Sequence, residues 1–209
     1  MFFARVSFNR NSWKRPSGRL GKCSTGIVFP EYYEFLNRFG WEEWNASEDR
    51  CHGGYQYGFL QAINSKDDLR GRIFEDIILF TRECSPQHNI DCFYIVGFIK
   101  KLETLTFIQG NQYRDIVGNF NKMREDIISV EANLQTFNND FNTCINMRYL
   151  LNNESGYFWD RVPKTDLIFP FGNEFSFGNL HGLINKNFER RVFEKINEIK
   201  TILKASSRR

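Results

Sequence analysis

Apolar and polar residues alternate with a period of two along several short segments of the chain. In residues 2–8, Phe2, Ala4, Val6 and Phe8 fall on one side, while the other side is more polar. Successive side chains of a β-strand point to opposite faces, so this alternation predicts a strand with one buried face.

Four further segments carry strand-like patterns. Residues 55–63 alternate aromatic with other side chains, and residues 91–106 hold the strongest β signal because β-branched and aromatic residues dominate them. Gly97 stands in the middle of that run, where a bulge or a barrel bend favours a glycine. Residues 141–151 also indicate a strand, whereas the apolar run 73–82 fits either a buried strand or a helix.

Three segments have patterns typical of helices. Residues 31–38 follow a proline and predict a short helix that ends near Gly40. Residues 110–137 predict the longest helix, because apolar side chains recur there at spacings of three and four, a stripe that we interpret as core packing. Residues 188–203 predict a second amphipathic helix near the end of the chain.

The order of these elements argues for an α+β fold. Several short strands, an early short helix, a long helix between late strands and a terminal helix favour a small bent sheet or barrel packed on helices. The chain shows no internal repeat and no low-complexity linker, so residues 1–209 are predicted to form a single domain.

Composition narrows the class of protein. Hydrophobic residues make up 41% and charged residues 25% of the 209 positions, which is typical of a globular domain. No run approaches the roughly 18 apolar residues of a membrane span, and the first ten residues do not resemble a secretory signal. The five scattered cysteines argue against a disulfide framework, so we expect a cytoplasmic protein. Because no membrane span is predicted, we expect no membrane partner.

The net charge of +3 hides an uneven distribution. Residues 1–30 contain bases and no acid, residues 186–209 are also basic, and the segment between them is acidic. Such asymmetry favours a polyanionic partner, although the basic ends can equally pair with the acidic body or serve solubility.

Motifs of known catalytic chemistry do not occur. The best match to a metal-dependent nuclease site runs from Asp91 to Lys100, but Gly97 stands where the second acid is needed. No Walker loop or GxSxG elbow is present. The spacing of Cys84, His88 and Cys92 offers thiolate and imidazole ligands but lacks the CxxC pairs of zinc sites, so we expect neither metal nor cofactor.

Aromatic and acidic residues concentrate in residues 39–61. Trp41 and Trp44 flank the adjacent acids Glu42 and Glu43, and alternating tyrosines follow a pair of glycines. Such a segment forms either a corner of the core or a pocket for a flat ligand. Nucleic-acid bases stack on such rings and bond to carboxylates, while a basic loop neutralises phosphates. The polar, basic loop at 9–22 contains the positively charged side chains that could neutralise phosphates.

The order of these motifs resembles the PUA-like superfamily, which includes EVE, ASCH and YTH domains. The resemblance rests on FGWEEW at 39–44, YGFLQ at 57–61 and YIVGFIKKLE at 94–103, after a first strand and a loop containing Trp13. It covers residues 1–150 and is closest to the modified-base readers of modification-dependent restriction systems. Residues 151–209 would be a C-terminal extension that ends in a helix, and no nuclease or motor segment accompanies them.

The resemblance implies a small bent β-barrel of about five or six strands with flanking helices. It also implies an aromatic pocket for a modified and flipped base. The residues expected in the base pocket are Asn11, Ser12, Trp13, Trp41, Glu43, Trp44, Tyr55 and Tyr57. The residues expected to contact phosphates are Arg10, Lys14, Arg15, Arg19 and Lys22.

The function expected from the sequence is therefore a non-catalytic nucleic-acid reader, with DNA favoured over RNA. A nuclease or motor, as a subunit or a fused domain, would be its partner in a restriction system. Two alternatives from other classes stay open: a metal-dependent nuclease or hydrolase with a non-standard site, and a protein–protein interaction module.

Overall fold

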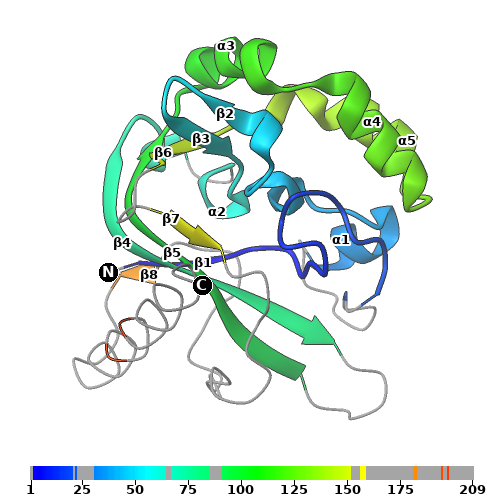
Figure 1. Ribbon diagram of the computed structural model, residues 1–209, viewed down its shortest axis with the longest axis horizontal. Coiled ribbons are helices and arrows are strands. Elements are labelled where there is room, and N and C mark those ends of the chain that lie inside the picture. The colour runs from blue at the N-terminus through cyan, green and yellow to red at the C-terminus, as the bar shows by residue number, and fades with distance from the viewer. Residues whose placement is uncertain are drawn as a thin grey trace, which may run out of the picture.

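The computed structural model combines a curved sheet with helices that gather along one end of the sheet (Figure 1). It describes residues 2–20, 22, 31–64, 67–84, 91–151, 156–158, 181–182, 194 and 197. The α+β class expected from the sequence is confirmed, because the described strands form one mixed sheet that is accompanied by several helices, and strands and helices come in groups along the chain.

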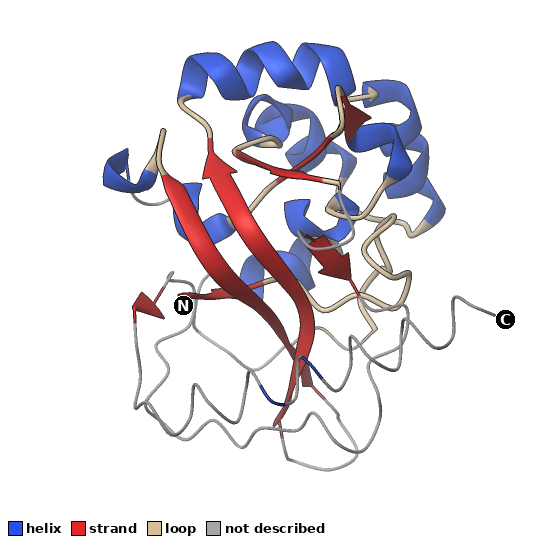
Figure 2. Ribbon diagram, turned by 60° about the vertical axis from the view of Figure 1, so that its left-hand side comes forward, coloured by secondary structure: helices blue, strands red, loops and turns tan. Residues whose placement is uncertain are grey.

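A long antiparallel hairpin forms the centre of the sheet. Its strands are β4 (Ile73–Cys84) and β5 (Asp91–Thr104), which pair along their whole length and curve together (Figure 2). Ile77, Ile78 and Leu79 are fully buried, so the ambiguous apolar run at 73–82 is a buried strand. The register shifts between Leu79 and Phe80 opposite Gly97, which places a bulge where a mid-strand glycine suggested one.

Shorter strands extend the hairpin on both sides. On the β4 side, β1 runs parallel to β4, and β8 runs antiparallel to β1. On the β5 side, β6, β3 and β2 follow in that order, each antiparallel to its neighbour. Strand β7 pairs separately with the middle of β5. The bounds of these strands are Phe2–Arg5 for β1, Cys51–His52 for β2, Tyr55–Gly58 for β3, Met147–Leu150 for β6, Gly156–Phe158 for β7 and His181–Gly182 for β8.

The described sheet is open, which corrects the expectation of a closed barrel. Its edge strands β2 and β8 each contain two residues and lie at opposite ends of the strand order. Closure requires edge strands that pair with each other at a fixed stagger, and these two do not pair within the described part of the chain.

Five α-helices and four short 3₁₀ turns complete the described structure. The helices are α1 (Glu31–Asn37), α2 (Gln61–Asn64), α3 (Phe107–Val117), α4 (Phe120–Ser129) and α5 (Leu134–Asp140). The turns are η1 (Trp41–Trp44), η2 (Glu48–Arg50), η3 (Asp67–Leu69) and η4 (Phe141–Thr143). Helices α3, α4 and α5 follow one another along the outer rim in Figure 1.

The single helix expected over residues 110–137 is wrong, because three helices occupy that segment. The side chains of Thr106, Asn119 and Asn133 each accept a hydrogen bond from the backbone amide three residues later and start a new helix. Short polar side chains compete with helix continuation in this way. The apolar stripe is nevertheless the packed face, since Met123 and Ile127 are buried.

Other boundaries differ from the sequence expectations in smaller ways. The helix expected at 31–38 is confirmed as α1, and the strand expected at 2–8 is regular only to Arg5. The strand expected at 55–63 ends at Gly58 and leads into α2, and the one expected at 141–151 is limited to β6. The terminal helix expected at 188–203 lies outside the described residues apart from two positions, so the division at residue 150 stays a prediction.

Aromatic rings form the core between the helices and the β3 side of the sheet. Phe39, Trp41, Trp44 and Phe137 are buried there with ring centroids 5.3 to 6.5 Å apart. Seven of the 22 phenylalanines are buried within the described residues, so packing explains part of the high phenylalanine content. No helix within the described residues has the length and apolarity that crossing a membrane requires.

Candidate functional site

The 3₁₀ turn η1 separates two different environments. All four of its residues are buried, and Gly40, which precedes it, donates its backbone N–H to Glu43 Oε1 at 3.0 Å. Positions three apart eclipse one another in a 3₁₀ turn, so the rings of Trp41 and Trp44 lie together with centroids 5.8 Å apart. The two glutamates between them reach different partners.

Glu43 holds the basic loop at 9–22 against the body of the protein. Its carboxylate accepts hydrogen bonds from Asn9 Nδ2 at 2.6 Å, from the Ser17 backbone at 2.8 Å and from Lys22 Nζ at 2.6 Å. The side chains of Lys22 and Glu43 are both fully buried. Buried charges are stable only when paired and hydrogen-bonded, so this pair is a structural clasp.

This clasp corrects two sequence assignments. Lys22 also donates to the backbone carbonyls of Gly18 and Arg38, so its ammonium is enclosed and cannot meet a phosphate in this conformation. Glu43 uses its oxygens within the clasp and does not face a base pocket. Neither glutamate of the pair is on the surface, because both are buried by the elements packed around η1.

Two of the tryptophans expected in the base pocket are core residues. Trp13 is 1% exposed, donates its indole N–H to the Ser7 carbonyl at 3.0 Å and accepts from the Ala46 amide at its own carbonyl. Trp44 is equally buried and donates to Asp126 at 2.9 Å. Their rings therefore do not converge with Trp41 on one open hollow. Trp44 lies against Trp41 within the aromatic core, and neither Trp13 nor Trp44 lines the cavity described below.

The tyrosines of β3 belong to another cluster. Tyr57 is 2% exposed and packs on the ring of Tyr113 at 4.6 Å. Tyr55 is half-buried beneath the guanidinium of Arg148, which lies 4.4 Å from its ring and is bonded to Glu103 at 2.8 Å. Both tyrosines stabilise the packing of α3 on the β3–β6 edge, and neither lines the cavity described below.

The remaining residues of the basic loop are more accessible. Asn11 and Ser12 are half-buried, and the Asn11 amide donates to the Pro16 carbonyl within the loop. Four cations of the loop are exposed: Arg10, Lys14, Arg15 and Arg19. Arg10 forms an ion pair with Glu83 at 3.3 Å, and Arg19 lies over the Phe35 ring at 4.7 Å.

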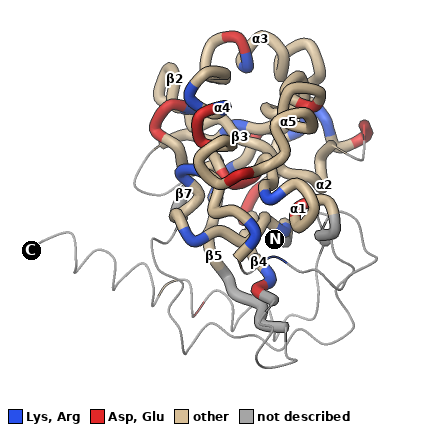
Figure 3. The backbone as a smooth tube through the Cα atoms, turned by 90° about the vertical axis from the view of Figure 1, so that its right-hand side faces the viewer, with Lys and Arg blue, Asp and Glu red and all other residues tan. Residues whose placement is uncertain are grey.

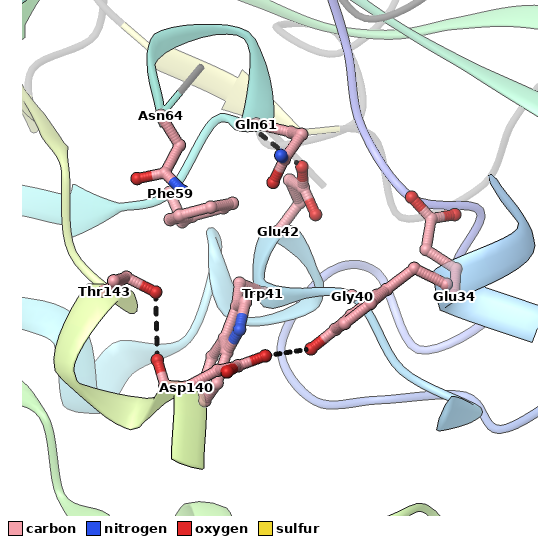
Figure 4. A pocket seen from close by; sticks show the side chains of 10 residues that line it. Glu34, Gly40, Trp41, Glu42, Phe59, Gln61, Asn64, Asp140 and Thr143 are labelled. Carbon is pink, nitrogen blue, oxygen red and sulfur yellow. Dashed lines mark hydrogen bonds between the residues drawn. The ribbon is translucent and has the colours of Figure 1, made fainter. Parts of the chain in front are cut away.

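A cavity of about 240 Å³ opens beside η1 and is lined by Trp41 and Glu42 of this turn. Its walls come from α1, η1, the segment after β3, α2, and the end of α5 with η4 (Figure 4). The residues that line it are Tyr33, Glu34, Gly40, Trp41, Glu42, Phe59, Gln61, Asn64, Asp140 and Thr143. Trp41 is the member of the expected base pocket that lines this cavity.

Glu42 is the buried carboxyl group of the cavity wall. Its Oε2 accepts from Ser7 Oγ at 2.8 Å. Its Oε1 accepts from the Gln61 backbone amide at 3.2 Å, and Figure 4 shows Glu42 and Gln61 side by side. Burial first, and then repulsion by Glu34, raise the pKa of Glu42 to about 7. The attraction of Arg5 lowers it by less, because the Arg5 guanidinium donates two bonds of 2.8 Å to Glu34.

Gly40 allows the close approach of η1 and Ser7, which follows β1, at this wall. A Cβ atom at this position would lie 1.9 Å from Ser7 Oγ and 3.0 Å from Glu42 Oε2. The sequence suggested that Gly40 ends a helix, but α1 already ends at Asn37 and the glycine has an extended backbone. It is required for space at the Glu42 carboxyl and not for a left-handed turn.

The far wall presents a phenol and a second carboxylate. Tyr33 donates its hydroxyl to Asp140 Oδ2 at 2.8 Å, and burial, followed by this bond, raises the pKa of Tyr33 above its ordinary value. Thr143 donates to the Asp140 carbonyl at 2.9 Å, which fixes the end of α5 beside the cavity. These groups are held by protein partners and give the wall a defined shape.

The chemistry of the cavity suits a flat polar ligand. Trp41 and Phe59 supply aromatic surface, and Glu42, Gln61 and Asn64 supply hydrogen-bonding groups. Within the described residues, no group of three or more His, Cys, Asp or Glu side chains could hold a metal ion. The side chains of Cys84, His88 and Cys92 lie outside that part.

Sequence reasoning missed most of the cavity. The missed residues are Tyr33, Glu34, Gly40, Glu42, Phe59, Gln61, Asn64, Asp140 and Thr143. The glutamate pair was noticed because it lies between Trp41 and Trp44 in the sequence. Nothing in the local sequence shows that Glu42 lines the cavity while Glu43 does not. Asp140 and Thr143 carry no signal at all, because they reach the cavity only through the packing of α5 on the aromatic core. Comparison of the chain with family models, with curated proteins and with solved structures finds no match.

Proposed function

We propose that the chain is a non-catalytic nucleic-acid reader that takes an unstacked base into the cavity beside η1, with DNA as the favoured polymer. The observation that carries the proposal is the pairing, in one cavity of about 240 Å³, of aromatic surface with the buried Glu42 carboxyl. A base can enter such a site only when it leaves its stack, at a cost of a few kcal/mol.

Stacking of the base on the aromatic rings of the cavity would offset part of the cost of unstacking it. Trp41 and Phe59 border the same space as the edge-reading groups Glu42 and Gln61 (Figure 4). Stacking of a base on an aromatic side chain contributes roughly 1–3 kcal/mol, and hydrogen bonds to a base edge add selectivity. A flat heterocycle with polar edges satisfies both kinds of group at once.

The basic loop and the cavity share the turn η1. Glu43 binds the loop, and the neighbouring Glu42 lines the cavity. The loop also carries the exposed cations Lys14 and Arg15, which on this proposal contact phosphates. Elsewhere, Figure 3 shows basic and acidic positions interleaved over the helical end of the molecule.

The assignment to the PUA-like superfamily is part of the same proposal. A curved sheet with a base-sized cavity at its helical end supports it, although the described sheet is open. On this proposal the chain is the specificity module of a modification-dependent restriction system, and a nuclease or motor is its partner.

Filling the cavity tests the proposal. Asn64→Phe places a ring into the cavity from the last residue of α2, a half-buried position. We expect it to weaken binding to a DNA duplex with a single mismatched base by about 5-fold or more, because loss of one stacked base costs roughly 1–3 kcal/mol. The matched control is Gln112→Phe on the exposed face of α3, which should bind as the unmodified protein does.

Salt dependence tests the role of the loop. The double variant Lys14→Glu and Arg15→Glu should lower affinity and flatten the dependence of log Kd on log salt, because fewer counterions are released. Lys101→Glu with Arg124→Glu makes the same charge change at exposed positions away from the loop. Equal affinities for both double variants, binding of Asn64→Phe at full strength, or cleavage of the DNA with Mg²⁺ would each contradict the proposal.

A further inference from the structure

We infer that the cavity beside η1 prefers a base that carries a positive charge on its ring over a neutral base of the same size. A base methylated at a ring nitrogen belongs to this class. The inference rests on the proposed function and names the ligand class of the same cavity. Two observations carry it together: the acidic charge of the cavity wall and the aromatic rings beside that charge.

The charged side chains of the wall are all acidic within the described part of the chain. Glu34 from α1, Glu42 from η1 and Asp140 from α5 line the cavity, and its described lining contains no Lys, Arg or His. Arg5 compensates one of these groups, because its guanidinium donates two bonds of 2.8 Å to Glu34. The wall thus keeps two carboxyl groups, those of Glu42 and Asp140, that form no ion pair with a described residue.

Glu42 and Asp140 keep hydrogen-bonding positions for a ligand. Each Glu42 oxygen accepts one bond from a neutral group, whereas a carboxylate oxygen has two acceptor positions. Asp140 accepts the Tyr33 hydroxyl at Oδ2, and its Oδ1 has no hydrogen-bond partner among the described residues. Burial and repulsion by Glu34 raise the pKa of Glu42 to about 7, which agrees with a wall that lacks positive charge. A cationic ligand would supply that charge.

Aromatic rings border the same space. Tyr33, Trp41 and Phe59 line the cavity, and Figure 4 shows Trp41 and Phe59 around the space that Glu42 also faces. The face of an aromatic ring attracts a cation through its quadrupole, most strongly for tryptophan. Carboxyl groups alone do not specify a ligand, and rings alone stack on any base. Together in one cavity they favour a flat group that is also positively charged.

The carboxyl groups of the wall suit a spread charge better than a metal ion. Glu34, Glu42 and Asp140 bind separate protein partners, and no group of three His, Cys, Asp or Glu side chains among the described residues could hold a metal. A base methylated at a ring nitrogen shares its positive charge between the ring and its amino group. That amino group can donate a charge-assisted hydrogen bond to a carboxylate while the ring lies against an aromatic face.

Two methylated cytosines test the effect of charge at constant size. 3-Methylcytosine is cationic at pH 7, whereas 5-methylcytosine is neutral. The experiment measures Kd for two single-stranded DNA oligonucleotides that differ only in this base, at pH 7 and constant ionic strength. No base pair has to open in a single strand, so both bases are equally available to the cavity. We expect the 3-methylcytosine strand to bind about 10-fold more tightly, which corresponds to about 1.4 kcal/mol, because it adds a cation–π contact and a charge-assisted hydrogen bond.

Substitutions locate the preference in the cavity. Glu42→Gln and Asp140→Asn each remove one uncompensated charge and keep the size of the side chain, so each should lower the ratio of the two affinities. The double variant should bring that ratio close to one. Glu125→Gln makes the same charge change at an exposed position of α4 and should keep the full ratio. An equal loss in Glu125→Gln and Glu42→Gln would assign the preference to the overall charge of the protein and contradict the inference.

The outcomes distinguish this inference from the proposed function. Equal affinity for the two strands, lowered in both by Asn64→Phe, overturns the inference while base binding stands. Absence of binding to either strand overturns both. Binding of a trimethyllysine peptide in place of either strand would show a site for an aliphatic cation and would also overturn both. Circular dichroism establishes folding of the variants, and the comparison of the two strands on the unmodified protein decides the inference even if a variant does not fold.

Discussion

The buried carboxyl of Glu42 predicts an unusual dependence of stability on pH. Its pKa rises from 4.5 in the unfolded chain to about 7 in the folded protein, chiefly through burial. The folded state therefore holds a proton that the unfolded state releases between these values. Because the folded state binds more protons in that window, the free energy of unfolding falls as pH rises.

The size of the effect follows from the shift. A pKa difference of one unit corresponds to about 1.36 kcal/mol, so a rise from 4.5 to about 7 amounts to about 3 kcal/mol. This contribution is fully present below pH 4.5, decreases through the window and is absent above pH 7. Glu42→Gln cannot ionise, so its stability relative to the unmodified protein should improve by about 3 kcal/mol between pH 4 and pH 8.

Urea unfolding followed by tryptophan fluorescence at several pH values measures this difference, because the free energy of unfolding extrapolates linearly to zero denaturant. Glu125→Gln, an exposed position on α4, is the matched control and should keep the pH profile of the unmodified protein. If the stability difference between Glu42→Gln and the unmodified protein is the same at pH 4 and pH 8, Glu42 is ionised in the folded state and the reasoning fails.

Three further predictions concern stability. Lys22→Met leaves the Glu43 carboxylate buried without its cation and should cost about 3–5 kcal/mol in urea unfolding; the cost should shrink when Glu43→Leu is added, and an equal cost in the double variant would contradict the clasp. Gly40→Ala drives a methyl group against Ser7 Oγ and should cost about 1–3 kcal/mol, whereas a cost near zero would show that η1 and the segment after β1 can separate freely. Phe137→Ala removes a fully buried ring that contacts both tryptophans of η1 and should cost about 3–5 kcal/mol, measured as a lower urea midpoint; a cost below 1 kcal/mol would show that the aromatic core collapses onto the gap.

Local patterns predicted those elements whose shape depends on near neighbours. Helix α1 follows from a proline start, and strand β5 follows from a run of β-branched and aromatic residues, whereas the apolar run of β4 fitted either a strand or a helix. The prediction of one long helix is wrong because the side chains of Asn119 and Asn133 cap new helices within the segment. The spacing of the apolar residues does not reveal these caps. The prediction of a closed barrel is wrong because closure depends on pairing between edge strands that are distant in the sequence. No local pattern specifies that pairing.

The sequence by itself determined that this protein is an α+β protein with an aromatic core, since period and residue type are enough to place buried faces on strands and helices. Only the tertiary structure decided the roles of the two adjacent glutamates. Lys22 lies beside Glu43 and comes from a loop, whereas Ser7 bonds to Glu42 from the segment after β1, and Glu34 and Asp140 line the cavity of Glu42 from α1 and α5. The charge and burial of a side chain depend on these long-range neighbours, so identical residues one position apart became a structural anchor and the wall of a cavity.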